Sequence, residues 1–146
     1  MARRAARVVL LDPADRVLLL RSFASGPDGR PGWYLPGGGI RPFEAIDAAA
    51  RRELREETGI DAIIGPLLAQ RTGVRFVFRG RIVVQDEWYL AGRTTPTTVG
   101  TGKPGDGERR AIDAHRWWTA AELAATDDEL HPPGLADLVR AAAECL

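Results

Sequence analysis

Three consecutive glycines stand just upstream of the clearest helical segment in this chain of 146 residues. The glycines are Gly37–Gly39, and the segment from Glu44 to Thr58 contains no internal glycine or proline and holds the helix formers Ala48–Ala50. Pro42 precedes the segment, and Gly59 stands where helices often end with a left-handed residue. The sequence therefore predicts a helix over Glu44–Thr58 that begins directly behind a glycine-rich turn.

Three glutamates of the predicted helix share one face. At about 100° per residue, Glu56 lies about 60° to one side of Glu53 and Glu57 about 40° to the other side. Like charges at these spacings repel one another by a few tenths of a kcal/mol per pair, so stability alone would favour alternating signs. Clustered carboxylates suit a hard divalent cation such as Mg²⁺ or Mn²⁺. Taken alone, the pattern equally describes a solvated helix face on which Arg52 pairs with Glu56.

The glycines and the glutamates stand at a defined spacing. Five residues separate Gly38 from Glu44, seven more lead to Arg52-Glu53-Leu54, and the segment closes with Glu56-Glu57 and Gly59-Ile60. This pattern matches every fixed position of the Nudix box, so the chain resembles the Nudix (MutT-like) hydrolases. The flanks are also similar to the family, and they extend the resemblance over most of the chain: Leu18–Arg21, Trp33–Gly38 and Arg116–Trp118.

The resemblance implies a fold and an activity. The expected fold is α+β, a Nudix-type α/β/α sandwich with a mixed central sheet, built as one domain over residues 1–146. The expected activity is hydrolysis of a diphosphate linkage in a nucleoside diphosphate joined to another moiety, with Mg²⁺ or Mn²⁺ as cofactor. An alternative is a Nudix-fold sensor that binds a nucleotide without hydrolysis. Such modules usually lose box glutamates, whereas this chain keeps them.

The substrate class is narrowed by two segments downstream of the box. Relatives that act on ADP-ribose place a proline where this chain has Arg75 and Phe76. Relatives that act on diadenosine polyphosphates place a tyrosine where residues 77–79 are Val-Phe-Arg. These absences mildly favour nucleoside triphosphates as substrates.

The resemblance also implies a role for the residues around the metal. Glu56 and Glu57 are the expected main metal carboxylates, and Glu53 is a further ligand or the base that activates water. The carbonyl of Gly37 is expected to complete the metal shell, while Arg52 orients the glutamates through ion pairs. All of these are oxygen donors or partners of oxygen donors, as a hard cation requires.

Further residues have expected roles at the edge of this site. Glu44 ties the glycine-rich loop to the helix, and Gly59 ends the helix. Gly38 lets the backbone approach the substrate closely, and Arg21 is a candidate phosphate contact. Family members often recruit another acid from outside the box, and Glu108 is preferred here over the other two candidates, Asp86 and Glu87.

Two positions depart from the commonest form of the box. Arg41 stands where an acidic residue is frequent, and it is expected either to meet a phosphate or to face water. Phe43 stands where glycine is frequent, and it is expected to stiffen the loop as a hydrophobic staple.

The remaining sequence predicts hairpins and two further helices. The expected strands are Ala5–Leu11 with Arg16–Arg21, Trp33–Leu35, Ile60–Gln70 with a bulge at Gly65-Pro66, Val74–Phe78 with Arg81–Ala91, and Arg110–Trp118 as the last. Gly92–Gly107 is expected to be a long loop. Thr119 is expected to cap a short helix in a capping box with Glu122, and Pro133–Cys145 to form the C-terminal helix. Trp33 and Trp118 are expected in the core.

Composition excludes several other functions. The chain has 20 basic and 20 acidic residues, so it lacks the basic excess that a non-specific nucleic-acid binder shows. No apolar run is long enough to span a membrane. The single cysteine, Cys145, allows no internal disulfide and suits a reducing compartment. The expected protein is cytoplasmic, a monomer or homodimer, and its partner is a small nucleotide substrate.

Overall fold

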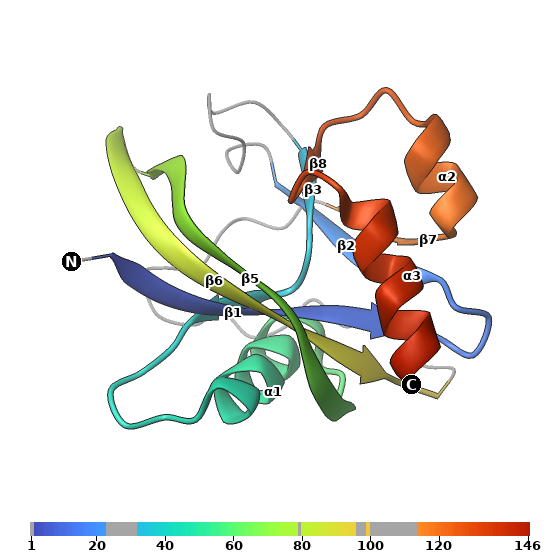
Figure 1. Ribbon diagram of the computed structural model, residues 1–146, viewed down its shortest axis with the longest axis horizontal. Helices are drawn as coiled ribbons and strands as arrows, with labels where there is room; N and C mark the ends of the chain where they lie inside the picture. The colour runs from blue at the N-terminus through green and yellow to red at the C-terminus, as the bar shows by residue number, and fades with distance from the viewer. Residues whose placement is uncertain (1, 23–31, 79, 96–98, 100–113) are drawn as a thin grey trace.

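The computed structural model describes residues 2–22, 32–78, 80–95, 99 and 114–146. Eleven helices and strands are found in this part of the chain (Figure 1). In order they are β1 (Arg3–Leu11), β2 (Val17–Ser22), β3 (Gly32–Tyr34), β4 (Gly37–Gly39), α1 (Ile46–Thr58), β5 (Ile63–Phe78), β6 (Arg81–Arg93), β7 (Ala114–Trp118), α2 (Ala120–Ala125), β8 (Leu130–His131) and α3 (Leu135–Cys145). None of the described helices is long and apolar enough to cross a membrane.

The strands form one mixed sheet around β1. Its order is β5-β6-β1-β2-β3-β8, with β4 paired to β1 and β7 paired to β2. Strands β1 and β6 run parallel along the whole of β1, whereas the pairs of β1 with β2 and with β4 are antiparallel. The mixed α+β sheet expected from the sequence is therefore confirmed.

Helices cover both faces of the sheet, with α1 on one side and α3 on the other (Figure 1). Side chains of a strand alternate between its two faces, and β1 is apolar on both. The side chains on the α1 face pack with Leu54 of the helix, and they include Ala6, Val8 and Leu10. Those on the α3 face pack with Val139, and they include Val9 and Leu11. Strand β1 thus contributes to two separate hydrophobic cores.

The helix α1 begins at Ile46 rather than at the predicted Glu44. Ala45 is the N-cap residue and has extended backbone angles, with φ −69° and ψ 150°. At the other end Gly59 adopts φ 74° and donates its N–H to the carbonyl of Arg55, which confirms the predicted end of the helix.

Most predicted strands are present, with three differences. The glycines 37–39 form β4 instead of a turn, and β5 is one strand of 16 residues instead of two, with register shifts near the predicted bulge. A short strand, β8, follows β7, so the predicted last strand is not the last. Strand β6 continues to Arg93, and most of the predicted loop Gly92–Gly107 lies outside the described residues.

Two further local predictions are confirmed. Trp33 and Trp118 are both buried, and their rings meet edge to face with centroids 5.3 Å apart. Thr119 and Glu122 form the reciprocal capping box at the start of α2. Both features bring β7 and α2 against the α3 side of the sheet.

Candidate functional site

The glycine strand β4 lies directly against the central strand β1. Gly37 is opposite Arg7, and Gly38 is opposite Ala6. A side chain at position 37 has no room, because a Cβ built there would lie 2.1 Å from the carbonyl oxygen of Ala6, and φ is 149°. Glycine is therefore required at Gly37 for both space and backbone conformation.

Helix α1 brings two of its glutamates onto this strand. The N–H of Gly37 donates to Oε1 of Glu57, with 2.7 Å between the nitrogen and the oxygen. A Cβ built on Gly38 would lie 2.6 Å from the carboxyl carbon of Glu53, so the carboxylate lies flat against a bare backbone. Segments 16 to 20 positions apart in sequence thus meet as the sequence predicts.

Arg52 links the helix to the loop that precedes it. Its guanidinium donates to both carboxylate oxygens of Glu44, each at 2.8 Å, and to the carbonyl of Gly39 at 2.9 Å. It also donates to Oε1 of Glu53 at 2.9 Å and to Oε1 of Glu56 at 3.5 Å. The side chain of Arg52 is only 18% exposed, so these charge-assisted bonds are partly shielded from water.

The contacts of Arg52 shift the pKa values of the pair it forms with Glu44. The hydrogen bonds from Arg52 lower the pKa of Glu44 from 4.5 to about 2, and the backbone N–H of Arg41 contributes to the same shift. In return, the bonds to Glu44 and Glu53 raise the pKa of Arg52. The pair is therefore ionised at every ordinary pH, which supports the tethering role expected of Glu44.

The chemistry of the cluster fits a hard divalent cation. Its donors are carboxylate oxygens of Glu53, Glu56 and Glu57 and the nearby carbonyl of Gly37, which are ligands that Mg²⁺ and Mn²⁺ prefer. In the part of the chain that the structure describes, however, no three acidic, histidine or cysteine side chains are gathered closely enough to hold a metal. Instead, Arg52 and the N–H of Gly37 bind the carboxylates.

A buried polar cluster on β1 and β6 adjoins the glycine strand, and sequence reasoning did not assign it. Nε of Arg7 donates to Oε2 of Glu87 at 3.2 Å, while its Nη1 donates to the carbonyl of Gly37 at 3.2 Å. Gln85 donates to the same oxygen of Glu87 at 2.7 Å, and the hydroxyl of Tyr89 donates to the other at 2.6 Å. Alternating polar residues in an otherwise apolar strand are the sequence signal that marks this cluster.

Burial and charge act against each other in this cluster. Burial alone would raise the pKa of Glu87, but the charge of Arg7 and three hydrogen bonds more than offset it and lower that pKa. Burial alone would also lower the pKa of Arg7, yet the carboxylates of Glu87 and Glu57 raise it. Burial, reinforced by the charge of Glu87, raises the pKa of Tyr89. The cluster therefore holds a charged pair beneath the protein surface.

The candidate acids outside the box occupy different places. Glu87 lies in the buried cluster beside Gly37, whereas Asp86 accepts the N–H of Gly73 at 3.0 Å on an exposed part of the β5–β6 hairpin. Glu108, the preferred candidate, lies outside the described residues. Arg21 lies with its guanidinium carbon 5.8 Å from the centroid of the Trp33 ring, on β2.

The predicted hydrophobic staple at Phe43 is wrong. Its side chain is fully exposed and packs on no core, and its φ of 64° lies in the left-handed region that glycine adopts freely. The backbone conformation explains why glycine is frequent at this position. Arg41 is exposed as well, and its guanidinium lies 3.9 Å from Oε1 of Glu56.

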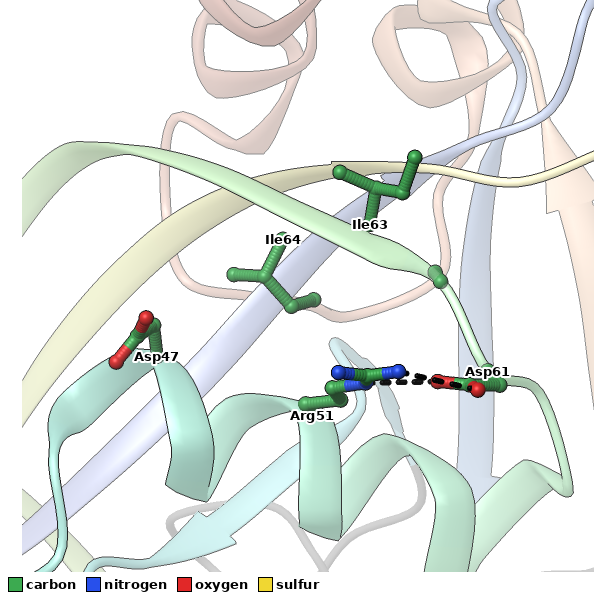
Figure 2. Close-up of a pocket in the computed structure, with 6 residues that line it drawn as sticks. Asp47, Arg51, Asp61, Ile63 and Ile64 are labelled. Carbon is green, nitrogen blue, oxygen red and sulfur yellow. Dashed lines mark hydrogen bonds and ion pairs between the residues drawn. The ribbon is translucent and has the colours of Figure 1, made fainter.

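A hollow of about 350 Å³ lies elsewhere, between α1 and the start of β5 (Figure 2). Arg51 and Asp61 form an ion pair in it at 2.8 Å, and Ile63 and Ile64 line the same hollow. Arg51 lies on the side of α1 away from Glu53, as the helical spacing predicts. The hollow therefore does not contain the glutamate cluster.

Comparison with known proteins gives one family and a consistent fold. The model of the NUDIX domain matches residues 1–140. An RNA pyrophosphohydrolase of Teredinibacter turnerae is 28% identical over 146 residues, which cover 90% of this chain and 82% of the relative. The 8-oxo-dGDP phosphatase NUDT18 of Danio rerio is 34% identical over 75% of this chain, but the match spans only 30% of that longer protein.

The NUDIX domain of Shewanella oneidensis NrtR, solved in complex with ADP ribose, superposes with a TM-score of 0.71. It is 18% identical, and the match covers 96% of this chain and 87% of that one. At this identity the likeness concerns the fold alone.

Proposed function

The chain belongs to the NUDIX family and is a Nudix hydrolase, and on that premise we propose that it hydrolyses a diphosphate linkage in a nucleotide with the help of Mg²⁺ or Mn²⁺. The observation that carries the proposal is the meeting of Glu53 and Glu57 with the glycine strand β4. Relatives named RNA pyrophosphohydrolase and 8-oxo-dGDP phosphatase support the reaction class.

The residues of α1 would hold the cation. Glu56 and Glu57 are the proposed main ligands, with Glu53 and the carbonyl of Gly37 beside them. When bound, the cation neutralises charge on the diphosphate oxygens and so favours attack at phosphorus. All these donors are hard oxygens, which supports Mg²⁺ or Mn²⁺ over a softer metal.

Each remaining box residue prepares the site for this chemistry. Arg52 fixes Glu53 through Oε1, so the other oxygen, Oε2, is the proposed acceptor of the proton from the attacking water. The bidentate pair of Arg52 with Glu44 holds the loop against the helix. Gly38 leaves backbone without a side chain beside the reacting groups, where a phosphate can approach.

We propose nucleoside triphosphates as the preferred substrates. The support is the sequence after the box, which lacks the proline and tyrosine of relatives that act on ADP-ribose or diadenosine polyphosphates. The test is phosphate release across a panel of nucleoside triphosphates, ADP-ribose and dinucleoside polyphosphates, coupled to a pyrophosphatase and a phosphatase and run with and without Mg²⁺. A higher kcat/KM on ADP-ribose than on every triphosphate would overturn this preference.

Charge-removing variants test the reaction itself. Glu53→Gln and Glu57→Gln should each reduce kcat at least about 100-fold, since each removes a group that acts on the reacting atoms. Glu144→Gln is the matched control because this glutamate is exposed on α3, and it should keep the rate of the unchanged protein. Full rates in both box variants would refute the assignment. Hydrolysis of no diphosphate compound would favour a nucleotide-binding sensor.

A further inference from the structure

Arg7 is a buried cation placed between two oxygen donors of the candidate site. Its side chain is 9% exposed, and its guanidinium joins the Glu87 carboxylate to the carbonyls of Gly37 and Leu35. The pairing of β1 with β4 places Arg7 opposite Gly37, and the parallel pairing with β6 places Glu87 nearby on the same face. Two neighbouring strands therefore fix the position of this charge.

Glu87 is satisfied without a metal. Arg7 and Gln85 bind one of its carboxylate oxygens, Tyr89 binds the other, and the charge of Arg7 balances its own. A buried carboxylate of this kind needs a cationic partner, because burying an unpaired charge is costly. In this protein the partner is a guanidinium supplied by the chain itself.

We propose that Arg7 takes the place of a divalent cation between Gly37 and Glu87, so that Glu87 is not a metal ligand. The inference rests on the proposed function, since it concerns which side of the Gly37 carbonyl the metal takes. A carbonyl oxygen has two lone pairs. Arg7 binds Gly37 on the side of Glu87, and the metal is confined to the side of the α1 glutamates. Arg7 is thus a positioning residue, acting through Gly37 and Glu87.

The first test is the number of Mn²⁺ ions bound, measured by electron paramagnetic resonance at constant pH. Glu87→Gln should bind as many Mn²⁺ ions as the unchanged protein, whereas Glu57→Gln should bind fewer. Loss of a bound Mn²⁺ in Glu87→Gln would overturn the inference. If instead Glu57→Gln kept every bound Mn²⁺ while Glu87→Gln lost one, the metal ligands of the proposed function would also be wrong.

The second test removes the internal cation. Arg7→Met leaves Glu87 without its guanidinium, so this variant should gain a Mn²⁺ site and show a larger Mn²⁺-induced rise in Tm than the unchanged protein. Arg7→Met combined with Glu87→Gln should lose that gain. A folded Arg7→Met variant with no additional Mn²⁺ site would overturn the inference. If Arg7→Met does not fold, the Glu87→Gln measurement decides.

Arg7→Lys separates charge from shape. Lysine keeps the positive charge but not the planar fork that reaches several acceptors. This variant should bind the same number of Mn²⁺ ions as the unchanged protein, even where its Tm is lower. A gain of Mn²⁺ in Arg7→Lys equal to that in Arg7→Met would contradict the role of the charge.

Discussion

Phe43 has an unfavourable backbone conformation that no packing offsets. Its φ is 64°, and its side chain is fully exposed. A left-handed conformation costs a residue with a side chain about 1–2 kcal/mol, and an exposed ring recovers little of that cost. The cost therefore reduces the net stability of the fold.

Replacing Phe43 by glycine should stabilise the protein. Glycine removes the left-handed cost, while its greater freedom in the unfolded chain cancels about 0.5–1 kcal/mol of the gain. The expected net gain is about 1 kcal/mol in the free energy of unfolding, measured by urea denaturation. Phe43→Ala is the matched control, since it also removes the ring but keeps a Cβ. Equal stability of the alanine and glycine variants would exclude backbone strain as the cause.

Glu44 should give the protein a stability that depends on pH. Because Arg52 lowers its pKa from 4.5 to about 2, this carboxylate stabilises the folded state above pH 4.5. The contribution should fall progressively as the pH is lowered from 4.5 towards 2. We therefore expect the difference in Tm between the unchanged protein and Glu44→Gln to be largest near neutral pH and to shrink across that window. A difference in Tm that stayed constant from pH 7 to pH 2 would contradict the shift.

The elements with local signals could be predicted from sequence, whereas the pairing of β4 could not. Helix α1 ends at Gly59 because a glycine there adopts a positive φ, and this depends on a few neighbouring residues. The bond from Arg7 to Gly37 joins residues 30 positions apart, and that from Arg7 to Glu87 joins residues 80 apart. Nothing near Gly37 in sequence indicates which strand it meets, so a run of glycines is read as a turn.

The contact between β4 and α1 can be tested at Gly38. A Cβ there would overlap the carboxylate of Glu53, which is the far end of a flexible side chain and can move aside. Gly38→Ala should therefore lower kcat at least about 10-fold by displacing Glu53, and shift Tm little. Combined with Glu53→Gln, it should reduce kcat no further than Glu53→Gln alone. Additive losses in the double variant would show that Gly38 acts independently of Glu53.

At the scale of the whole molecule, β1 couples two hydrophobic cores. Leu54 of α1 and Leu135 of α3 are each at most 1% exposed, and they pack on opposite faces of the sheet. Since one strand contributes to both cores, neither core can lose its packing without exposing β1. The protein is therefore expected to unfold in a single transition.

Truncations in either core should destabilise the same transition. Leu54→Ala and Leu135→Ala should each lower the free energy of unfolding by about 2–5 kcal/mol. Leu67→Ala is the control, because this leucine is 53% exposed on β5 and should change stability by no more than about 0.5 kcal/mol. Urea denaturation followed by tryptophan fluorescence and by far-ultraviolet circular dichroism measures both. Two separate midpoints in either variant would refute the coupling.

The close seating of β4 on β1 also limits how this domain can be recombined with its relatives. Ala5 and Ala6 of β1 are completely buried and lie opposite Gly39 and Gly38, so larger side chains at these positions would push the glycine strand away. The glycine strand, the helix behind it and the first strand of the chain thus form one inheritable unit. A chimera that exchanges residues 37–59 alone separates matched surfaces, whereas one that also exchanges residues 3–11 carries both halves of the contact.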